Sequence, residues 1–309
     1  MNKQEKALLE NQQYGLTGNH SAVKICTWTK KSLRDEGVCY KEKFYGIKSH
    51  KCCQMTPSLG ICQNECIFCW RDQKVKGSFK PLDEPEDIIK NSVIEQRRLL
   101  NGFKGNAKVN MEKFEQAQNP DQYAISLSGE PTLYPKLSEL IERLHKAGCT
   151  TFLVTNGLQP GLLTELAMPT QLYVSLDAPN EELFNKIDKS SVKDAWKKLN
   201  ETLDLLPLLN KKTRTAIRIT LIKGYNLVAP EQYAARIEKS SPMFVEVKGY
   251  MFVGSSRQRL SMENMPRHPE VKAFAEKICK HCSYKIVDEQ PISRVVLLMK
   301  EDKDRFIKP

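Results

Sequence analysis

Three closely spaced cysteines carry the clearest chemical signature in this sequence. Cys62, Cys66 and Cys69 follow the pattern C-x3-C-x2-C, and no obvious fourth cysteine follows them in the local sequence. Three thiolates at this spacing can hold three irons of a [4Fe–4S] cube. The fourth iron is then open to a small molecule. The triad therefore predicts an iron–sulfur centre that takes part in chemistry.

An open iron can chelate the amino and carboxylate groups of a methionine moiety. One electron can then enter the sulfonium of an adenosylated methionine and release an adenosyl radical. Phe68, just before the last cysteine, could pack on the adenine. The alternative is a zinc site with His50 or Cys53 as fourth ligand. Zinc modules usually pair two hooks that lie far apart, so the single compact triad favours iron and sulfur.

A second set of cysteines precedes the triad. Cys26, Cys39 and Cys52 are separated by two equal gaps of twelve residues, and Cys53 competes with Cys52 for the third place. Seven of the ten cysteines fall between Cys26 and Cys69. In a chain that begins without an export signal, such a cluster favours metal or redox chemistry over disulfides. Three cysteines just before a cluster loop predict a second metal site.

The rest of the chain alternates strand-like and helix-like segments, which predicts an α/β fold with a parallel sheet. A doubly wound sheet and a partial barrel both fit this pattern. The expected strands are residues 53–58, 122–128, 150–155, 171–177, 214–222 and 244–253. The expected helices are residues 85–100, 135–147, 192–205 and 230–239, with added strands at 284–288 and 294–299.

Polar residues stand at the ends of four successive strands, where the active sites of barrel enzymes lie. They are Glu130, with Gly129 and Pro131 on either side of it, Asn156, Ser175, Asp177 and Arg218. The first 50 or so residues lack this rhythm and are dense in Cys, Lys and aromatic residues. Such a segment is expected to need a metal to hold its shape.

The triad with an aromatic before its last cysteine resembles the radical S-adenosylmethionine superfamily. That resemblance implies a partial (βα)6 TIM-like barrel. It also implies that Gly129-Glu130-Pro131 holds the methionine amino group. Asn156, Ser175 and Asp177 would contact the nucleoside, and Arg218 would reach the methionine carboxylate.

The paired cysteine sets, together with Lys41-Glu42-Lys43-Phe44-Tyr45-Gly46, resemble the tRNA 4-demethylwybutosine synthase family. The resemblance implies a second [4Fe–4S] cluster on Cys26, Cys39 and Cys52. It also implies a Schiff base between Lys41 and pyruvate, and an amine attacks a carbonyl only when neutral, which burial or a nearby cation such as Lys43 would favour.

The implied substrate is tRNA-Phe with 1-methylguanosine beside the anticodon, and the implied product is tricyclic 4-demethylwyosine. Larger family members carry a flavodoxin-like domain. This chain begins 25 residues before Cys26. We therefore expect an external electron donor such as flavodoxin or ferredoxin.

These features divide the chain into three expected parts. Residues 1–54 form a cysteine-rich N-terminal extension with the second cluster, residues 55–290 form the radical core, and residues 291–309 form a C-terminal strand and tail. Cys279 and Cys282 lie on an apolar helical stripe that begins at Val271, so we expect them to be core residues rather than ligands.

The charge favours a polyanionic partner. Lys plus Arg number 48 against 37 Asp plus Glu, a formal net charge of +11. Basic and aromatic residues interleave in segments 41–51, 70–80 and 257–268, although each alone is typical of a solvated face. The charged start and the short apolar runs predict a cytoplasmic protein without a membrane partner. The alternative functions are a glycyl-radical activase and a non-catalytic, zinc-stabilised RNA-binding module.

Overall fold

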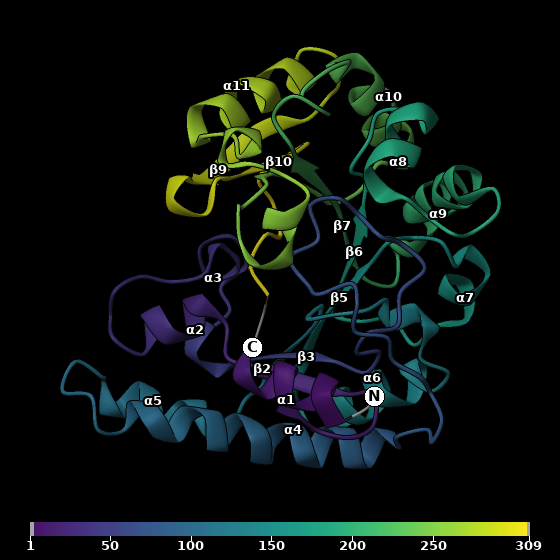
Figure 1. The fold of residues 1–309 in the computed structure, drawn as a ribbon. Coiled ribbons are helices and arrows are strands. Elements are labelled where there is room, and N and C mark those ends of the chain that lie inside the picture. The colour runs from purple at the N-terminus through teal and green to yellow at the C-terminus, as the bar shows by residue number, and fades with distance from the viewer. Residues whose placement is uncertain (1–2, 308–309) are drawn as a thin grey trace.

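A ten-stranded sheet organises the computed structural model, which describes residues 3–307 (Figure 1). Its strand order is β1-β2-β3-β4-β5-β6-β7-β8-β10-β9. The strands from β3 to β8 pair in parallel, each with the next along the chain. They are β3 (Cys52–Thr56), β4 (Gln122–Ile125), β5 (Thr150–Thr155), β6 (Gln171–Ser175), β7 (Arg214–Leu221) and β8 (Phe244–Gly249).

Antiparallel strands extend both edges of this parallel core. On one side lie β2 (Ala22–Lys24) and β1 (Gly15–Leu16), and on the other β10 (Val295–Met299) and β9 (Lys285–Gln290). Within residues 3–307 no hydrogen bonds join β1 to β9, so the curved sheet stays open. The expected partial barrel and the two added C-terminal strands are confirmed.

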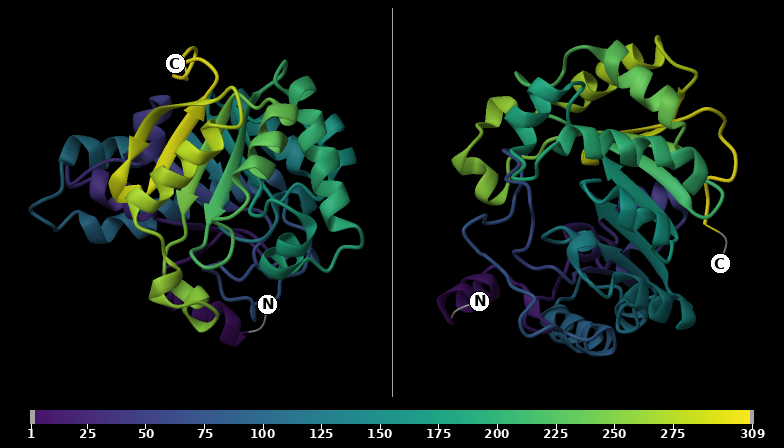
Figure 2. Two further views of the ribbon diagram at one scale, coloured as in Figure 1. Left: turned by 90° about the horizontal axis from the view of Figure 1, so that it is seen from above. Right: turned by 90° about the vertical axis from the view of Figure 1, so that its right-hand side faces the viewer.

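Helices cover the outer face of the sheet, in an arc that runs in Figure 1 from α4 through α7 to α11. Figure 2 shows the purple helix of residues 3–11 and the yellow segment that follows β10 on opposite sides of the molecule. The outer helices are α4 (Pro85–Leu100), α6 (Leu137–Lys146), α7 (Pro160–Glu165), α8 (Glu181–Asp188), α9 (Ala195–Leu209), α10 (Pro230–Ser240) and α11 (His268–Cys279). None of the helices in residues 3–307 is long and apolar enough to cross a bilayer.

Apolar and charged residues alternate along the strands. Successive side chains point to opposite faces of the sheet, so the two faces differ in chemistry. In β7, Ile217 and Ile219 belong to the main core under the helices. Arg218, between them, lines a cavity on the inner face. In β8, Val245 and Val247 likewise face the core, and the intervening strand positions face inward. The helix side is therefore apolar, and the inner side carries the charged groups.

Helix α3 (Tyr40–Tyr45) fills the inner face at the amino ends of the strands. Phe44 and Tyr45 belong to a second apolar cluster that includes Phe152, Tyr173 and strand β10. The Tyr45 hydroxyl donates a 2.7 Å hydrogen bond to the buried carboxylate of Glu246. The second oxygen of that carboxylate has no partner among the described residues. We call α3 the plug, because it fills this end of the inner face. Its contacts are otherwise apolar, and the hydrogen bond from Tyr45 to Glu246 fixes its position.

Several short elements do not appear among the expected ones, because their sequences are too short to show a period. They are α1 (Lys3–Asn11), α2 (Thr27–Ser32), α3, α5 (Met111–Ala117), α7, α8, β1 and β2. The strand expected at 122–128 ends at Ile125, because the amides of Ser126 and Leu127 both turn to the carbonyl of Met55. The strand expected at 244–253 ends at Gly249.

We expect Tyr45→Phe to lower the free energy of unfolding of the apo-protein by about 2–3 kcal/mol, because it removes a hydrogen bond to a buried carboxylate. Urea unfolding measures this difference. The matched control is Tyr284→Phe, since the buried Tyr284 hydroxyl donates to the neutral carbonyl of Pro242 at 2.5 Å. That control should lose about 1 kcal/mol. If both variants lose the same free energy of unfolding, the Tyr45 hydroxyl does not act by stabilising the charge of Glu246.

Candidate active site

The carboxyl ends of the parallel strands open onto one cavity of about 660 Å³. All three triad cysteines line it, and so does Cys26 of the other set. Phe68, Gly129, Glu130, Asn156, Ser175, Asp177 and Arg218 also line this cavity. Pro131 is buried in the following turn and is absent from the wall. The structure therefore brings together nearly all residues expected around the triad.

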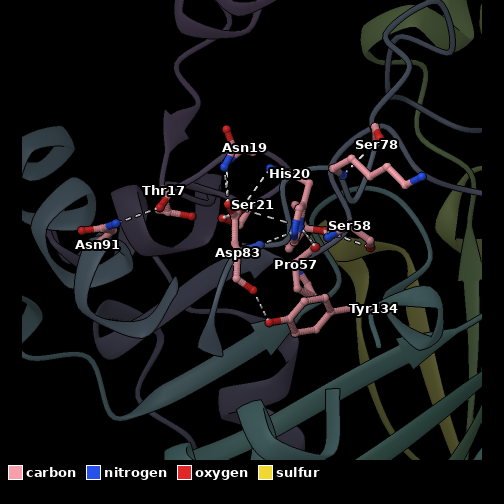
Figure 3. Close-up of polar contacts among 12 residues, drawn as sticks. Thr17, Asn19, His20, Ser21, Pro57, Ser58, Ser78, Asp83, Asn91 and Tyr134 are labelled. Carbon is pink, nitrogen blue, oxygen red and sulfur yellow. Dashed lines mark hydrogen bonds and ion pairs between the residues drawn. The ribbon is translucent and has the colours of Figure 1, made fainter. Parts of the chain in front are cut away.

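A clamp fixes the two ends of the loop that carries the triad (Figure 3). The Nδ1 of the buried His20 contacts the Pro57 carbonyl at 2.6 Å, and its Nε2 accepts from the Asp83 amide at 2.8 Å. The ring is therefore a neutral Nδ1–H tautomer that bridges both loop ends. The Asp83 carboxylate in turn accepts from the Asn19 and His20 amides and the Ser21 hydroxyl at 2.8, 3.0 and 2.9 Å.

These donors decide the charge state of Asp83. Burial alone would raise the pKa of Asp83, but the donors outweigh it and hold the pKa below its usual value. Asp83 is therefore an anion at neutral pH. The Tyr134 hydroxyl adds a 2.6 Å hydrogen bond to the Asp83 carbonyl.

Two further contacts brace the middle of the triad loop. The amide of Ile67 bonds to the carbonyl of Ile187 at the end of α8, at 2.9 Å. On the other side, the Arg259 guanidinium donates to the carbonyls of Ile67 and Cys69. The loop is thus held from β6–α8 and from the segment after β8, which fixes the direction of its thiols.

The triad thiols lie among charged groups. Cys66 Sγ is 3.3 Å from Asp188 Oδ1, and burial together with Asp188 raises the pKa of that thiol well above its usual value. Arg71 Nε donates to Cys69 Sγ at 3.1 Å, and Arg71 also hydrogen-bonds Cys62. Burial raises the pKa of Cys62, although Arg71 opposes that effect. The half-buried Arg71 guanidinium thus lies against the triad thiols, and a positive charge beside a thiol favours the thiolate form that binds metal.

Gly129 and Glu130 press directly on the triad loop. Gly129 has φ of +73°, and a Cβ there would lie 1.7 Å from the Ser58 carbonyl oxygen, so only glycine fits. The Glu130 amide bonds to the Ile61 carbonyl at 2.7 Å. Its carboxylate accepts from the Thr155 hydroxyl at 2.7 Å and from the Asn156 amide at 2.8 Å. Glu130 is therefore a rigidly placed hydrogen-bond acceptor. It directly follows Gly129, where the backbone after β4 comes closest to the backbone of Ser58.

Unpartnered polar atoms mark the wall of the cavity as a binding surface. Asn64, Asn156, Asp188 and Arg218 each carry at least one buried side-chain N or O atom without a partner among the described residues. Buried polar atoms are normally hydrogen-bonded. These groups therefore fit a polar ligand held beside the triad. Asp177 is already fixed, because its Oδ1 accepts from the Thr220 amide at 2.7 Å.

The thiols of the second cysteine set lie near enough to act on one another electrostatically. Cys26 and Cys39 stand directly before α2 and α3 with nearly identical backbone angles, and Cys52 begins β3. Burial and the neighbouring Cys26 raise the pKa of Cys39 to about 12. Burial also raises the pKa of Cys52 to about 12, and Cys26 and Cys39 add to it. Cys53 points to the opposite face and is fully buried in the main core, which supports Cys52 as the third member.

Neither residue considered as a fourth zinc ligand, His50 or Cys53, lines the cavity with the triad. In residues 3–307, no three His, Cys, Asp or Glu side chains converge as they would around one ion. His50 lies apart from the triad, with Nε2 at 2.7 Å from Gln116. Cys279 ends α11, and Cys282, just beyond it, contacts the Ile278 carbonyl. Thiols set around a cavity instead fit a cube whose irons stand at separate corners.

Lys41 lies below the cavity rather than in its wall. Its side chain is 9% exposed, and Nζ sits 4.7 Å from the ring centroids of both Phe152 and Tyr173. Lys43, two residues on, pairs instead with Asp288 at 2.8 Å. Residues two apart on a helix do not face each other. The expectation that Lys43 acts on the Lys41 amine is therefore not supported.

Several charged residues of the site, Asp188 and Lys24 in the cavity wall among them, were not expected from the sequence. Arg71 contacts the triad thiols, Lys248 lines the cavity, and Glu246 is fully buried beneath it. Burial, with Arg218 nearby, lowers the pKa of Lys248 to about 8. For Glu246 and Lys248 the sequence did contain a signal. They alternate with Val245 and Val247, and charged residues are rare in a strand that is otherwise apolar.

Comparison with known proteins gives consistent results along the whole chain. Residues 56–237 match the Radical SAM superfamily, and residues 239–300 match the family described as wyosine base formation. The S-adenosyl-L-methionine-dependent tRNA 4-demethylwyosine synthase of Pyrococcus horikoshii is 49% identical, over 100% of this chain and 94% of that protein. The Methanocaldococcus jannaschii protein of the same name is 41% identical over 96% of both chains.

Solved structures agree with this result. A structure of TYW1 with a lysine-pyruvate adduct bound superposes with a TM-score of 0.88, at 39% identity over 99% of this chain and 98% of that one. A crystal structure of archaeal TYW1 gives 0.81, at 35% identity over 99% and 100%. The human TYW1 protein is 38% identical over 94% of this chain, which spans 40% of the human length.

The buried Asp177 yields a prediction on pH. Burial raises its pKa to about 6, above the unfolded value of about 3.9. The folded state therefore holds an extra proton between these values, so the free energy of unfolding falls as pH rises through this range and levels off above it. Asp177→Asn should stabilise the apo-protein at pH 8 by up to about 3 kcal/mol, and the gain should vanish towards pH 4.

Urea unfolding of the apo-protein between pH 5 and 8 measures this effect. Asp83→Asn is the control of opposite sign, because the pKa of Asp83 is lowered by its donors. That variant should be less stable than the wild type at pH 8. A loss of stability in Asp177→Asn that does not change with pH would contradict the assignment.

Proposed function

This chain belongs to the family of S-adenosyl-L-methionine-dependent tRNA 4-demethylwyosine synthases, and on that basis we propose that it is a pyruvate-dependent radical lyase. It would convert 1-methylguanosine beside the anticodon of tRNA-Phe into 4-demethylwyosine. The observation that carries this proposal is a single cavity lined by the whole triad and by Cys26 of the second set. Family membership favours this function over a glycyl-radical activase or a zinc-stabilised RNA-binding module.

The triad wall suits S-adenosylmethionine. When bound to Cys62, Cys66 and Cys69, an iron–sulfur cube would supply the electron that cleaves the sulfonium. Glu130, fixed by its four donor contacts, would accept from the methionine amino group. The free Arg218 Nε would donate to the methionine carboxylate. Asn156, Ser175 and Asp177 would hold the nucleoside, and Phe68 would pack on adenine.

The second cysteine set would hold a further cluster near pyruvate. Cys26, Cys39 and Cys52 influence one another electrostatically, and Lys41 acts on both Cys39 and Cys52. An amine in this place can condense with the keto carbonyl of pyruvate to form an imine and water. The imine fixes the second carbon of pyruvate and makes the later carbon–carbon bond formation effectively intramolecular. The electron donor would be a separate flavodoxin or ferredoxin.

The charge of +11 supports tRNA as the macromolecular substrate. Trp70, Met251 and Val253 line the cavity, and the last two are 37% and 42% exposed. Trp70 stacks on Tyr14 with 6.4 Å between ring centroids. An anticodon-loop base can be splayed out towards such a surface at modest cost. Ten free cysteines also fit the expected cytoplasmic location.

Product formation tests the function directly. Anaerobically reconstituted enzyme, given reductant, S-adenosylmethionine, pyruvate and tRNA bearing 1-methylguanosine, should yield 4-demethylwyosine by nucleoside analysis. We expect about eight irons per chain. The Cys62/Cys66/Cys69 triple alanine variant should keep roughly half of the iron and form neither product nor 5′-deoxyadenosine.

The matched control is the Cys149/Cys279/Cys282 triple alanine variant, which removes three thiols that lie outside the cavity. It should keep all iron and the wild-type activity. Formation of 5′-deoxyadenosine by the triad variant would refute the assignment of the triad, and product formation without pyruvate would refute the proposed co-substrate.

Borohydride trapping tests the role of Lys41. Pyruvate with borohydride should give a stable adduct that peptide mass spectrometry locates on Lys41, and Lys41→Ala should abolish both the adduct and product formation. Lys43→Ala is the control, because its exposed ammonium is held in an ion pair. An adduct on Lys43, or an active Lys41→Ala enzyme, would overturn the proposal.

A further inference from the structure

Lys248 is a charged residue of the cavity wall that the steps above do not use. It lies on the inner face of β8, next to Thr220 of β7 in the sheet register. Its Nζ donates to the Ser293 carbonyl at 3.1 Å and lies 5.1 Å from the centroid of the Tyr40 ring. The side chain thus lines the cavity, and its ammonium is anchored to the Ser293 carbonyl.

This ammonium lacks an acidic partner. Among residues 3–307, no Asp or Glu oxygen lies within ion-pair distance of Lys248, whereas Lys43 and Arg305 both pair with Asp288. An ammonium has three donors, and the Ser293 carbonyl takes one of them. A cation withdrawn from bulk water is costly unless an anion or several acceptors compensate it. The site therefore favours an anionic ligand.

The surrounding charges reinforce this preference. Arg218 stands opposite Glu246 in the register of β7 and β8 and is near enough to Lys248 to act on it. Glu246 is buried beneath the wall rather than in it, and Tyr45 already occupies its first oxygen. Asp177 lies in the same wall and acts on Arg218, whereas no carboxylate of the described residues pairs with Lys248. This unpaired ammonium suits a carboxylate ligand.

The position of Lys248 indicates which carboxylate it receives. Its electrostatic neighbours include Cys39 and Cys26 of the second set. Lys41 and Lys248 both act on the Cys39 thiol, so the two amines flank the same part of the site. Glu130, which would hold the methionine end of the cofactor, belongs to the opposite, triad side.

We propose that Lys248 binds the carboxylate of the α-keto acid while Lys41 captures its carbonyl. This inference rests on the proposed function and names the residue that selects a keto acid over a neutral ketone. Lys248 is a binding residue in this scheme. The keto acid is held at two points, its carboxylate by Lys248 and its carbonyl carbon by Lys41. A two-point grip would orient the second carbon of the keto acid towards the radical.

Selective trapping tests the proposal. Reconstituted wild type, Lys248→Met and Lys248→Arg are treated with borohydride and either pyruvate or its neutral methyl ester, and the adduct on Lys41 is quantified by mass spectrometry. In Lys248→Met the pyruvate concentration for half-maximal trapping should rise about tenfold or more, the loss expected for one charged hydrogen bond. Trapping of methyl pyruvate should not change, and Lys248→Arg should retain most of the preference for pyruvate.

Iron content and electron paramagnetic resonance of each variant show whether the clusters are intact, and Lys43→Met controls for loss of a nearby positive charge. Equal losses with pyruvate and methyl pyruvate, or loss of the second cluster in both variants, would overturn the inference and assign Lys248 a structural role.

Calorimetric titration with pyruvate separates this inference from the proposed function. Tighter binding by wild type than by Lys248→Met, without any adduct, would support the carboxylate site and refute the Schiff base. Product formation with unchanged pyruvate affinity in Lys248→Met would refute the carboxylate site alone. A wild-type enzyme that neither binds pyruvate nor forms product would overturn both.

Discussion

The close approach of Gly129 to the backbone of Ser58 is the contact on which the site geometry depends. No side chain fits between the end of β4 and the start of the triad loop, because a Cβ on Gly129 would overlap the Ser58 carbonyl. This contact places the Glu130 amide on the Ile61 carbonyl. The acceptor for one end of the cofactor and the cysteines that would hold the cluster therefore move as one unit. A loop of this length would otherwise sample many conformations.

The other constraints on the triad loop act on its ends and its middle. Asp83 and His20 close the loop at its base, and Arg259 holds its far side. Each of these contacts satisfies backbone groups that a loop over a cavity would leave unpaired. These side-chain contacts therefore provide the hydrogen bonds that a helix or strand would otherwise give to the backbone of the loop. They also explain why β1 and β2 matter, since the Asn19–Ser21 turn between them supplies donors to Asp83.

The sequence predicted the parts of the fold and site that have a periodic or spaced signal. The six parallel strands alternate with helices, and the triad and the polar strand ends have recognisable spacing. The plug formed by α3 has neither, because six residues show no period and their burial depends on strands far along the chain. Lys248 and Glu246 were missed for a related reason. Their alternation with valine in β8 is visible in the sequence, but the cavity beside the inner face of the sheet is formed by residues from many segments of the chain.

Helix α3 joins stability and chemistry in one short segment. Tyr45 and Phe44 fix it under the sheet, while Cys39 at its start and Lys41 in its first turn face the second cysteine set. The plug also excludes bulk water from the amino ends of the strands, which strengthens electrostatic interactions within the site. In such surroundings an uncompensated cation acts strongly on any anion that enters. The apolar packing of α3 against the amino ends of the strands therefore also makes a single lysine, Lys248, able to discriminate a carboxylate from a neutral group.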